Sequence, residues 1–216
     1  SETGSQIAYK FYAPDTENRF LGISNPDGTE LKVIETLGTE TSDVAVNWSP
    51  TGQIIATFRD STEGDRQNVY FVGQEGENFE NLEVDGRGFL GEWSPNGRQM
   101  VYSIYSPDTD YKPRLWIANA DGSDLTGTGE LNLGIETYAD KCAFASETSL
   151  YCAVPRRLET GAGIYRELAD DTQDRFYRID VVTGDSSLVA NPVNKDRNNN
   201  VRASNLEVSD DGKTLY

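Results

Sequence analysis

A short turn motif returns several times along this chain and limits the folds that the chain can adopt. Residues 47–56 (NWSPTGQIIA) recur as residues 92–101 (EWSPNGRQMV). A third copy is 207–216 (EVSDDGKTLY), and a worn copy without the Pro-x-Gly element is 144–151 (FASETSLY). In the motif an apolar strand runs into a tight turn, where proline fixes φ and glycine accepts a positive φ, and a second β-rich strand follows. Each copy therefore predicts a β-hairpin.

A second hairpin motif follows each copy of the first. Residues 114–125 (RLWIANADGSDL) read as strand, turn and strand, and their relatives are 20–31, 69–76 and 176–184. Asp-Gly and Thr-Gly are tight-turn signals. Each period thus holds four short strands, which we name a, b, c and d in chain order. Four antiparallel strands in a period of about 40–50 residues are the signature of a propeller blade.

The paired motifs resemble the TolB-like (WD-repeat-like) β-propeller family, in which a WSPDG-type turn precedes an LWIANADG-type strand pair. The resemblance covers nearly the whole chain and implies an all-β propeller of four-stranded antiparallel blades. It says little about function, because such blades occur in scaffolds, in periplasmic proteins and in front of prolyl-oligopeptidase catalytic domains. The blade around Cys142 departs from the motif, since Phe144 stands where the tryptophan is expected. Its a–b turn also lacks the Pro-x-Gly element.

We expect one propeller domain over residues 1–216, with four to five blades visible and the first and last incomplete. The expected units are a partial blade at 5–38, complete blades at 44–84, 88–132 and 136–191, and a partial blade at 202–216. The expected strands of the two partial blades are b, c and d at 7–12, 20–24 and 31–35, then a and the start of b at 205–209 and 214–216. Closure of the first blade by the last segment would supply strand b twice. We therefore expect part of a larger propeller and hold closure as the alternative.

Charge and histidine content exclude several classes of function. The net charge is −17, from 36 acidic and 19 basic residues, and no basic stripe favours nucleic acid. The acidity fits solubility, a high-salt habitat or cationic partners. The absence of histidine removes the commonest general base and metal ligand, so we expect no enzyme activity, no cofactor and no metal site. No stretch approaches the roughly 20 apolar residues of a membrane helix, so this segment predicts no membrane insertion.

The only two cysteines fall at matching places in the repeat. Cys142 and Cys152 align with Val46 and Ala56, on opposite strands of an a–b hairpin. Cross-strand neighbours have Cβ atoms about 4.5–5.5 Å apart, within reach of a disulfide after slight adjustment. The alternative is two buried thiols. A disulfide would imply an oxidising compartment, so we expect a periplasmic, cell-surface or secreted protein, free or tethered through a segment outside these residues.

The connections between strands suggest where a partner binds. We expect short a–b and c–d turns and long b–c and d–a connections, which leave a blade at the same end. The long connections are expected at 13–18, 59–66, 106–113, 156–174 and 191–203. Loops on a rigid scaffold concentrate binding residues, and Arg and Tyr are favoured interface anchors. The binding candidates are Tyr111, Arg156, Arg157, Tyr165 and Arg166.

The largest connection has two interpretations. Residues 156–171 mix arginine, tyrosine and aliphatic side chains, as a partner site would. They could equally cover a blade edge or add a strand to their own sheet.

Other motifs carry weaker signals. Residues 108–110 and 170–171 offer carboxylates to Ca²⁺ but lack the spacing of an EF-hand loop, so we expect solvated loops. Residues 47–49 match a glycosylation sequon, but Pro50 follows and the site lies in an expected strand. The three tryptophans recur with the repeat or its strands and are expected in the core.

Three functions remain open. The first is a non-catalytic, extracytoplasmic propeller that binds an unidentified protein or other macromolecule through its long loops. The second is the regulatory propeller of a larger hydrolase of the prolyl-oligopeptidase type, recognisable by a Gly-x-Ser-x-Gly motif and a later histidine elsewhere in the protein. The third is a structural subunit of an extracellular assembly, joined through unpaired blade edges. The sequence leaves the oligomeric state open.

Overall fold

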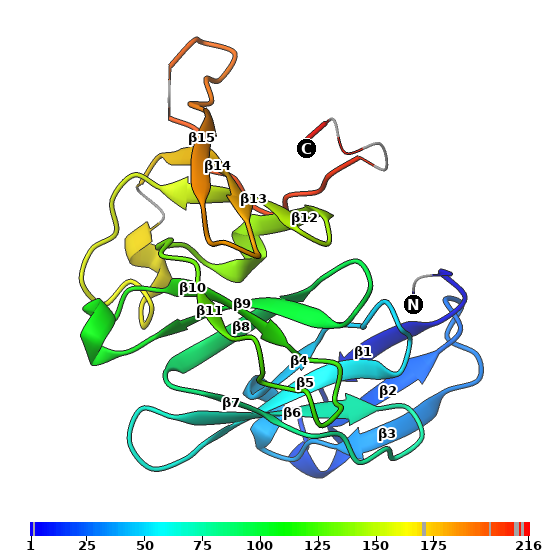
Figure 1. Ribbon diagram of the computed structural model, residues 1–216. Coiled ribbons are helices and arrows are strands. Elements are labelled where there is room, and N and C mark those ends of the chain that lie inside the picture. The colour runs from blue at the N-terminus through cyan, green and yellow to red at the C-terminus, as the bar shows by residue number, and fades with distance from the viewer. Residues whose placement is uncertain (2, 170–171, 199, 210–211, 213) are drawn as a thin grey trace.

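The computed structural model describes residues 1, 3–169, 172–198, 200–209, 212 and 214–216. Within these residues the strands form four antiparallel sheets, and in each sheet the strands lie side by side in chain order (Figure 1). Three sheets have four strands and the first has three. The prediction of an all-β chain built from four-stranded antiparallel blades is confirmed.

The strand bounds follow the repeat. The first sheet contains β1 (Ile7–Phe11), β2 (Phe20–Ser24) and β3 (Lys32–Thr36). The second contains β4 (Val44–Val46), β5 (Ile54–Ser61), β6 (Gln67–Gly73) and β7 (Leu82–Val84). The third contains β8 (Arg87–Trp93), β9 (Gln99–Tyr105), β10 (Arg114–Asn119) and β11 (Leu131–Asn132). The fourth contains β12 (Cys142–Ser146), β13 (Ser149–Pro155), β14 (Asp174–Asp180) and β15 (Ser186–Ala190).

Short 3₁₀ helices occupy connections between the strands. They are η1 (Thr16–Asn18), η2 (Glu40–Ser42), η3 (Pro107–Thr109), η4 (Ala139–Lys141) and η5 (Arg166–Ala169). In the described part of the chain, no helix has the length and apolar character needed to cross a membrane.

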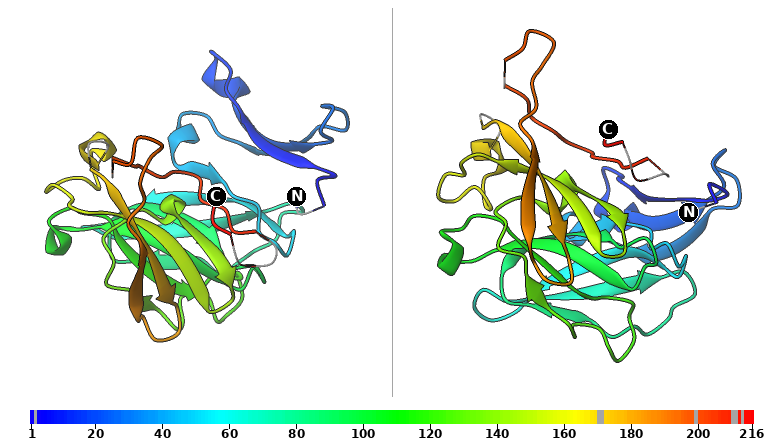
Figure 2. Two further views of the ribbon diagram at one scale, coloured as in Figure 1. Left: turned by 90° about the horizontal axis from the view of Figure 1, so that it is seen from above. Right: turned by 45° about the horizontal axis from the view of Figure 1, so that its top comes forward.

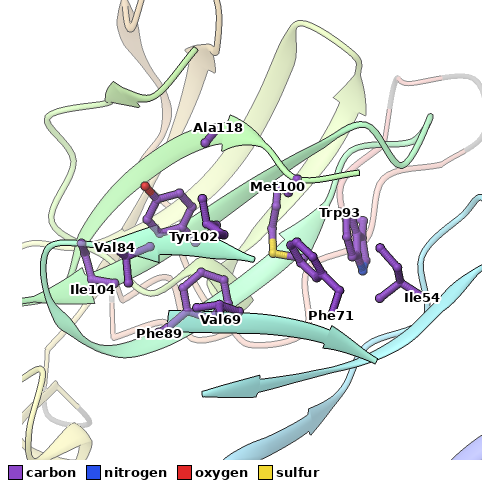
Figure 3. Close-up of a cluster of buried hydrophobic side chains, with 12 residues drawn as sticks. Ile54, Val69, Phe71, Val84, Phe89, Trp93, Met100, Tyr102, Ile104 and Ala118 are labelled. Atoms are coloured by element: carbon purple, nitrogen blue, oxygen red, sulfur yellow. The ribbon is translucent and has the colours of Figure 1, made fainter. Parts of the chain in front are cut away.

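The core lies between the faces of successive sheets rather than within any one of them. Figure 3 shows the cluster between the second and third sheets, where Phe89 packs 5.3 Å from Tyr102 and Phe71 packs 5.7 Å from Trp93, measured between ring centroids. Similar clusters join the first sheet to the second and the third to the fourth. Figure 2 shows the sheets as a series with the first and fourth at its two ends. A blade buries its faces only against its neighbours, so each sheet depends on the next.

All three tryptophans contribute to these clusters. Trp93 is 8% exposed, and Trp48 and Trp116 pack, partly buried, against neighbouring core residues. The prediction that the tryptophans serve core packing is confirmed.

Polar side chains of β1, β5 and β9, which are the b strands of three blades, also hold the start of the following blade. Lys10 donates to the carbonyls of Thr41 and Val44, at 2.8 and 2.6 Å. Arg59 donates to the carbonyls of Ser42 and Phe89, and the hydroxyl of Ser103 accepts the N–H of Ala139. Successive blades are therefore joined by hydrogen bonds as well as by apolar packing.

The a–b turns have the geometry that their sequence predicts. Gly52 and Gly97 have φ of 79° and 67°, and each donates its N–H to the backbone carbonyl of the serine three residues earlier at 2.8 Å. The worn copy also forms a hairpin, in which only two residues join β12 to β13. The altered motif is accommodated by a register shift between Phe144 and Ser146. The blade thus survives the loss of Pro-x-Gly.

The expectation that all long connections lie at one end is wrong in part. The c–d connections at 74–81 and 120–130 are long, whereas β5 continues to Ser61 and leaves a b–c connection of only 62–66. After β6 and β10 the chain bends near Gly76 and Gly122, whose φ are 76° and 77°, and then packs on a neighbouring blade before strand d begins. Phe79 packs against the core cluster of the second and third sheets, and Glu80 donates its N–H to the Gly122 carbonyl at 2.9 Å. Long loops therefore occur at both ends of the blades.

The C-terminal segment differs from its prediction. Instead of strands at 205–209 and 214–216, its described residues show an isolated bridge between Val208 and Leu215, with backbone bonds between Glu207 and Tyr216. β1 remains an edge strand, so the alternative in which 205–209 completes the first blade is not formed. The segment lies instead against the fourth sheet, where a pocket of about 330 Å³ separates it from Tyr151 and Phe176.

Candidate functional site

The longest connection within a blade is the insertion at 156–173, between β13 and β14. Its inner side is apolar, since Leu158, Ala162 and Ala169 are buried together with Tyr138 from the neighbouring loop. The hydroxyl of Tyr138 donates to the Ala162 carbonyl at 2.6 Å. Leu90 of β8 packs against the same cluster. The insertion therefore covers part of the third blade, as one interpretation of the sequence predicted.

Two backbone hydrogen bonds attach the insertion to the b–c connection of the third blade. Gly161 donates to the Asp110 carbonyl at 2.9 Å, and Gly163 donates to the Tyr111 carbonyl at 2.7 Å. At Gly163 a Cβ atom would lie 2.6 Å from carbons of Tyr105, so only glycine permits this close approach. The structure thus brings Tyr111 together with the insertion, although they are far apart in sequence.

Arg166 is exposed but pairs with another residue of the same chain. Its guanidinium donates to both carboxylate oxygens of Asp140, at 2.8 and 3.0 Å, and lies 4.4 Å from the centre of the Tyr138 ring. An arginine that holds a carboxylate in this paired fashion and stacks on an aromatic ring is well fixed. Arg166, predicted as a binding residue, is therefore placed where it anchors η5 to η4.

The outer side of the insertion exposes several apolar side chains among charged ones such as Arg166 and Glu167. We call it the insertion surface and define it by Tyr111, Ile164, Tyr165 and Leu168. Their exposed fractions are 37%, 47%, 58% and 39%. The same segment is therefore buried on one side and presents aromatic and aliphatic groups to solvent on the other, which is typical of a recognition surface.

Two further predicted arginines, Arg156 and Arg157, stand at the start of the insertion. Arg156 is exposed and uses its backbone N–H to bind the Gln173 carbonyl at 2.8 Å, which closes the base of the insertion. Arg157 is exposed and lies 3.5 Å from Glu159. No described residue forms an ion pair or hydrogen bond with the guanidinium of Arg156, and the ion pair of Arg157 is solvent-exposed, so both groups are accessible to a partner.

Glu92 is a notable group that the sequence did not single out. Burial raises the pKa of its carboxyl to about 7, and the negative charge of Asp140 adds to the rise. In the preceding blade the same repeat position is Asn47. Its side-chain amide donates to the Gly91 carbonyl at 2.5 Å, and its backbone carbonyl accepts the indole N–H of Trp93. The sequence signal that could have identified Glu92 is the repeat itself, because the second copy has a carboxyl group where the first copy has an amide. The side-chain amide of Asn47 is thus held against the third blade rather than presented as a glycosylation acceptor.

The cysteines form a disulfide between facing strands. Cys142 of β12 pairs directly with Cys152 of β13, and their Cα atoms lie 4.1 Å apart. Val46 and Ala56 pair in the same register in the second blade, as the repeat alignment predicted. The bridge lies in the core between the third and fourth sheets, close to Lys141 and the loop that supports the insertion.

Groups that could hold a metal do not converge in the described ranges. No set of three or more His, Cys, Asp or Glu side chains is arranged there around a common point. Asp108 and Asp110 are exposed in a loop, and residues 170–171 lie outside the described residues.

Comparison with known proteins identifies the fold. No protein-family model matches the chain, and no curated protein matches its sequence. TolB from Acinetobacter baumannii aligns with 100% of this chain and 47% of its own, at a TM-score of 0.62 and 16% identity. The β-propeller domain of the Trilobed protease from Pyrococcus furiosus aligns with 88% of this chain and 55% of its own, at a TM-score of 0.54 and 15% identity.

A peptidase propeller gives a similar match. The acylaminoacyl peptidase of Pyrococcus horikoshii aligns with 86% of this chain and 31% of its own, at a TM-score of 0.52 and 14% identity. The chain spans about half the length of TolB and of the Trilobed protease domain, and less of the peptidase. At these identities the likeness concerns the fold alone. The chain has the β-propeller fold of TolB and of these peptidase domains.

Proposed function

We propose that this protein is a non-catalytic, extracytoplasmic propeller that binds a protein partner through the insertion surface. The observation that carries the proposal is the two-sided character of the insertion. Its inner side is fixed by a buried apolar cluster, by the Arg166–Asp140 ion pair and by two backbone bonds to the 106–113 connection. Its outer side exposes Tyr165 and its apolar neighbours. A rigid, aromatic surface loses little entropy on binding, which favours recognition.

The extracytoplasmic location rests on separate support. A disulfide persists in oxidising compartments and is rare in the cytosol. Cys142 and Cys152 face each other at bonding distance, and TolB-like propellers share the fold. Because both cysteines are buried, alkylation of the unfolded protein in denaturant, with and without reductant, tests the disulfide. Two thiols that react without reductant would contradict it.

The partner site can be tested by photocrosslinking. A photoreactive amino acid at Tyr165 is expected to capture one protein from an extracytoplasmic extract, and Ile164→Asp in the same molecule should abolish the capture. The matched control is the photoreactive group at Leu125, which is 56% exposed on a c–d connection. Equal crosslinking from Leu125, or capture unaffected by Ile164→Asp, would reject the insertion surface as the binding site.

A regulatory propeller of a hydrolase is the second candidate. The observation in its favour is the match to a Pyrococcus horikoshii acylaminoacyl peptidase at a TM-score close to that of the Trilobed protease domain. Peptidase activity of the whole protein toward short peptides, lost with a Gly-x-Ser-x-Gly serine, would establish it. A whole protein without such a serine would exclude it.

A further inference from the structure

The outermost strand of the fourth blade is exposed although it has the composition of a buried strand. All five residues of β15 are exposed, with Leu188 at 48% and Val189 at 55%. From 186 to 194 the chain carries no charged side chain. The comparable uncharged run at 99–107 contains β9, one of the most buried strands of the protein. The composition of β15 therefore suits an edge that another molecule covers.

The other outer strands in the described chain are protected against edge pairing. β3 carries Lys32 and Glu35, β7 has only three residues and carries Glu83, and β11 has only two residues. Charge and shortness are two of the ways in which proteins prevent unwanted pairing at a sheet edge. β15 has five residues and no charge, and its pairing with β14 shifts register only at Val189, so the backbone groups of 186–188 ahead of the shift are open to another strand.

The charges around β15 select the kind of strand that can pair there. The turn before it carries Asp185, which follows Asp180 at the end of β14, and the connection after it carries Lys195 and Arg197, with Asp196 between them. In an antiparallel pair of two β15 strands, the acidic turn of each copy approaches the basic connection of the other. The strand itself is neutral, so two molecules with a net charge of −17 can meet here without opposed like charges.

We propose that two copies of this chain associate by antiparallel pairing of β15 with β15, with Leu188 at the two-fold axis. A two-fold interface uses the same patch on both subunits, which the neutral strand and its oppositely charged flanks permit. Backbone hydrogen bonds join the two fourth blades into one continuous sheet, and the two Leu188 side chains face each other across the axis. The dimer is independent of the proposed function, because the insertion surface takes no part in it.

Light scattering on the purified chain over a concentration series tests the dimer. The wild type should rise toward twice the chain mass of 23.9 kDa. Leu188→Lys and Leu188→Glu each place like charges opposite one another at the axis, so each variant alone should stay monomeric. An equimolar mixture of the two variants should regain the dimer, because a lysine then faces a glutamate.

Matched variants on another outer strand control for a general effect of surface charge. Val33 of β3 is 51% exposed, and Val33→Lys and Val33→Glu should leave the dimer intact. Circular dichroism of each variant checks that the fold is retained. A wild type that stays monomeric throughout, or a dimer that survives both Leu188 variants, would overturn the proposal. A mixture that remains monomeric would reject the two-fold axis at Leu188.

Discussion

The ammonium group of Lys141 lies 2.8 and 2.7 Å from the two carboxylate oxygens of Asp174, and both side chains are buried. Asp174 also accepts the N–H of Ala203 at 2.7 Å and donates its own N–H to the Val201 carbonyl at 3.0 Å. One carboxylate therefore connects η4, the start of β14 and the segment that follows the fourth blade. Lys141 is next to Cys142, so the ion pair lies beside the disulfide.

We expect Asp174→Asn to lower the free energy of unfolding by about 3–5 kcal/mol, because it leaves the Lys141 charge buried without a counter-charge. Urea denaturation measures the loss, and hydrogen exchange should show earlier opening at 201–203. The matched control is Asp85→Asn, which removes an Arg66 ion pair of the same 2.8 Å length at an exposed position. Its cost should stay below about 1 kcal/mol. Equal losses for the two variants would contradict the assigned role of burial.

Glu92 predicts a pH dependence of stability with a definite sign. The pKa of its carboxyl rises from 4.5 to about 7 on folding, so the folded state retains a proton that the unfolded state releases. Stability from this group is greatest below about pH 4.5 and falls as the pH rises to about 7, by at most about 3 kcal/mol. Glu92→Gln should therefore be more stable than the wild type at pH 8, with the difference shrinking toward pH 4.

The preceding blade offers the converse variant. Asn47 occupies the repeat position of Glu92, and its side-chain amide donates a hydrogen bond to the Gly91 carbonyl. A carboxyl group at this position could donate that bond only when it is protonated. Asn47→Asp should introduce a loss of stability with rising pH of the same sign as that caused by Glu92. Thermal unfolding between pH 4 and 8 compares the three proteins. A Glu92→Gln variant that follows the wild-type pH profile would contradict the assignment.

Removal of the disulfide by Cys142→Ala with Cys152→Ala should lower the free energy of unfolding by about 2.5–3 kcal/mol on the chain-entropy estimate. Reductant should destabilise the wild type but not the double variant. The second blade provides a gain-of-function control, since Val46 and Ala56 pair in the register of the two cysteines. Val46→Cys with Ala56→Cys should form a second bridge. Its failure to form under oxidising conditions would show that the shared register is not sufficient.

The repeat determined most of the fold. The a–b and c–d hairpins, the blade order and the partnership of Cys142 with Cys152 follow from turn chemistry and strand alternation, which act over a few residues. Where contacts with another blade outweigh these local preferences, the predicted loop lengths and strands were wrong. Phe79 packs on the neighbouring blade and lengthens its c–d connection, and the segment after Asn205 lies against the fourth sheet instead of forming two strands.

For the candidate site, the sequence by itself determined which residue types were available and in which connections they lie. It located the insertion and the candidates Tyr111, Tyr165 and Arg166. Only the tertiary structure decided that Arg166 pairs with Asp140 and that Tyr165 faces solvent. The orientation of a side chain in a long loop depends on what the loop packs against. Here the insertion packs one side against Tyr138, which comes from a different connection of the chain, and the residues on its other side remain exposed to solvent.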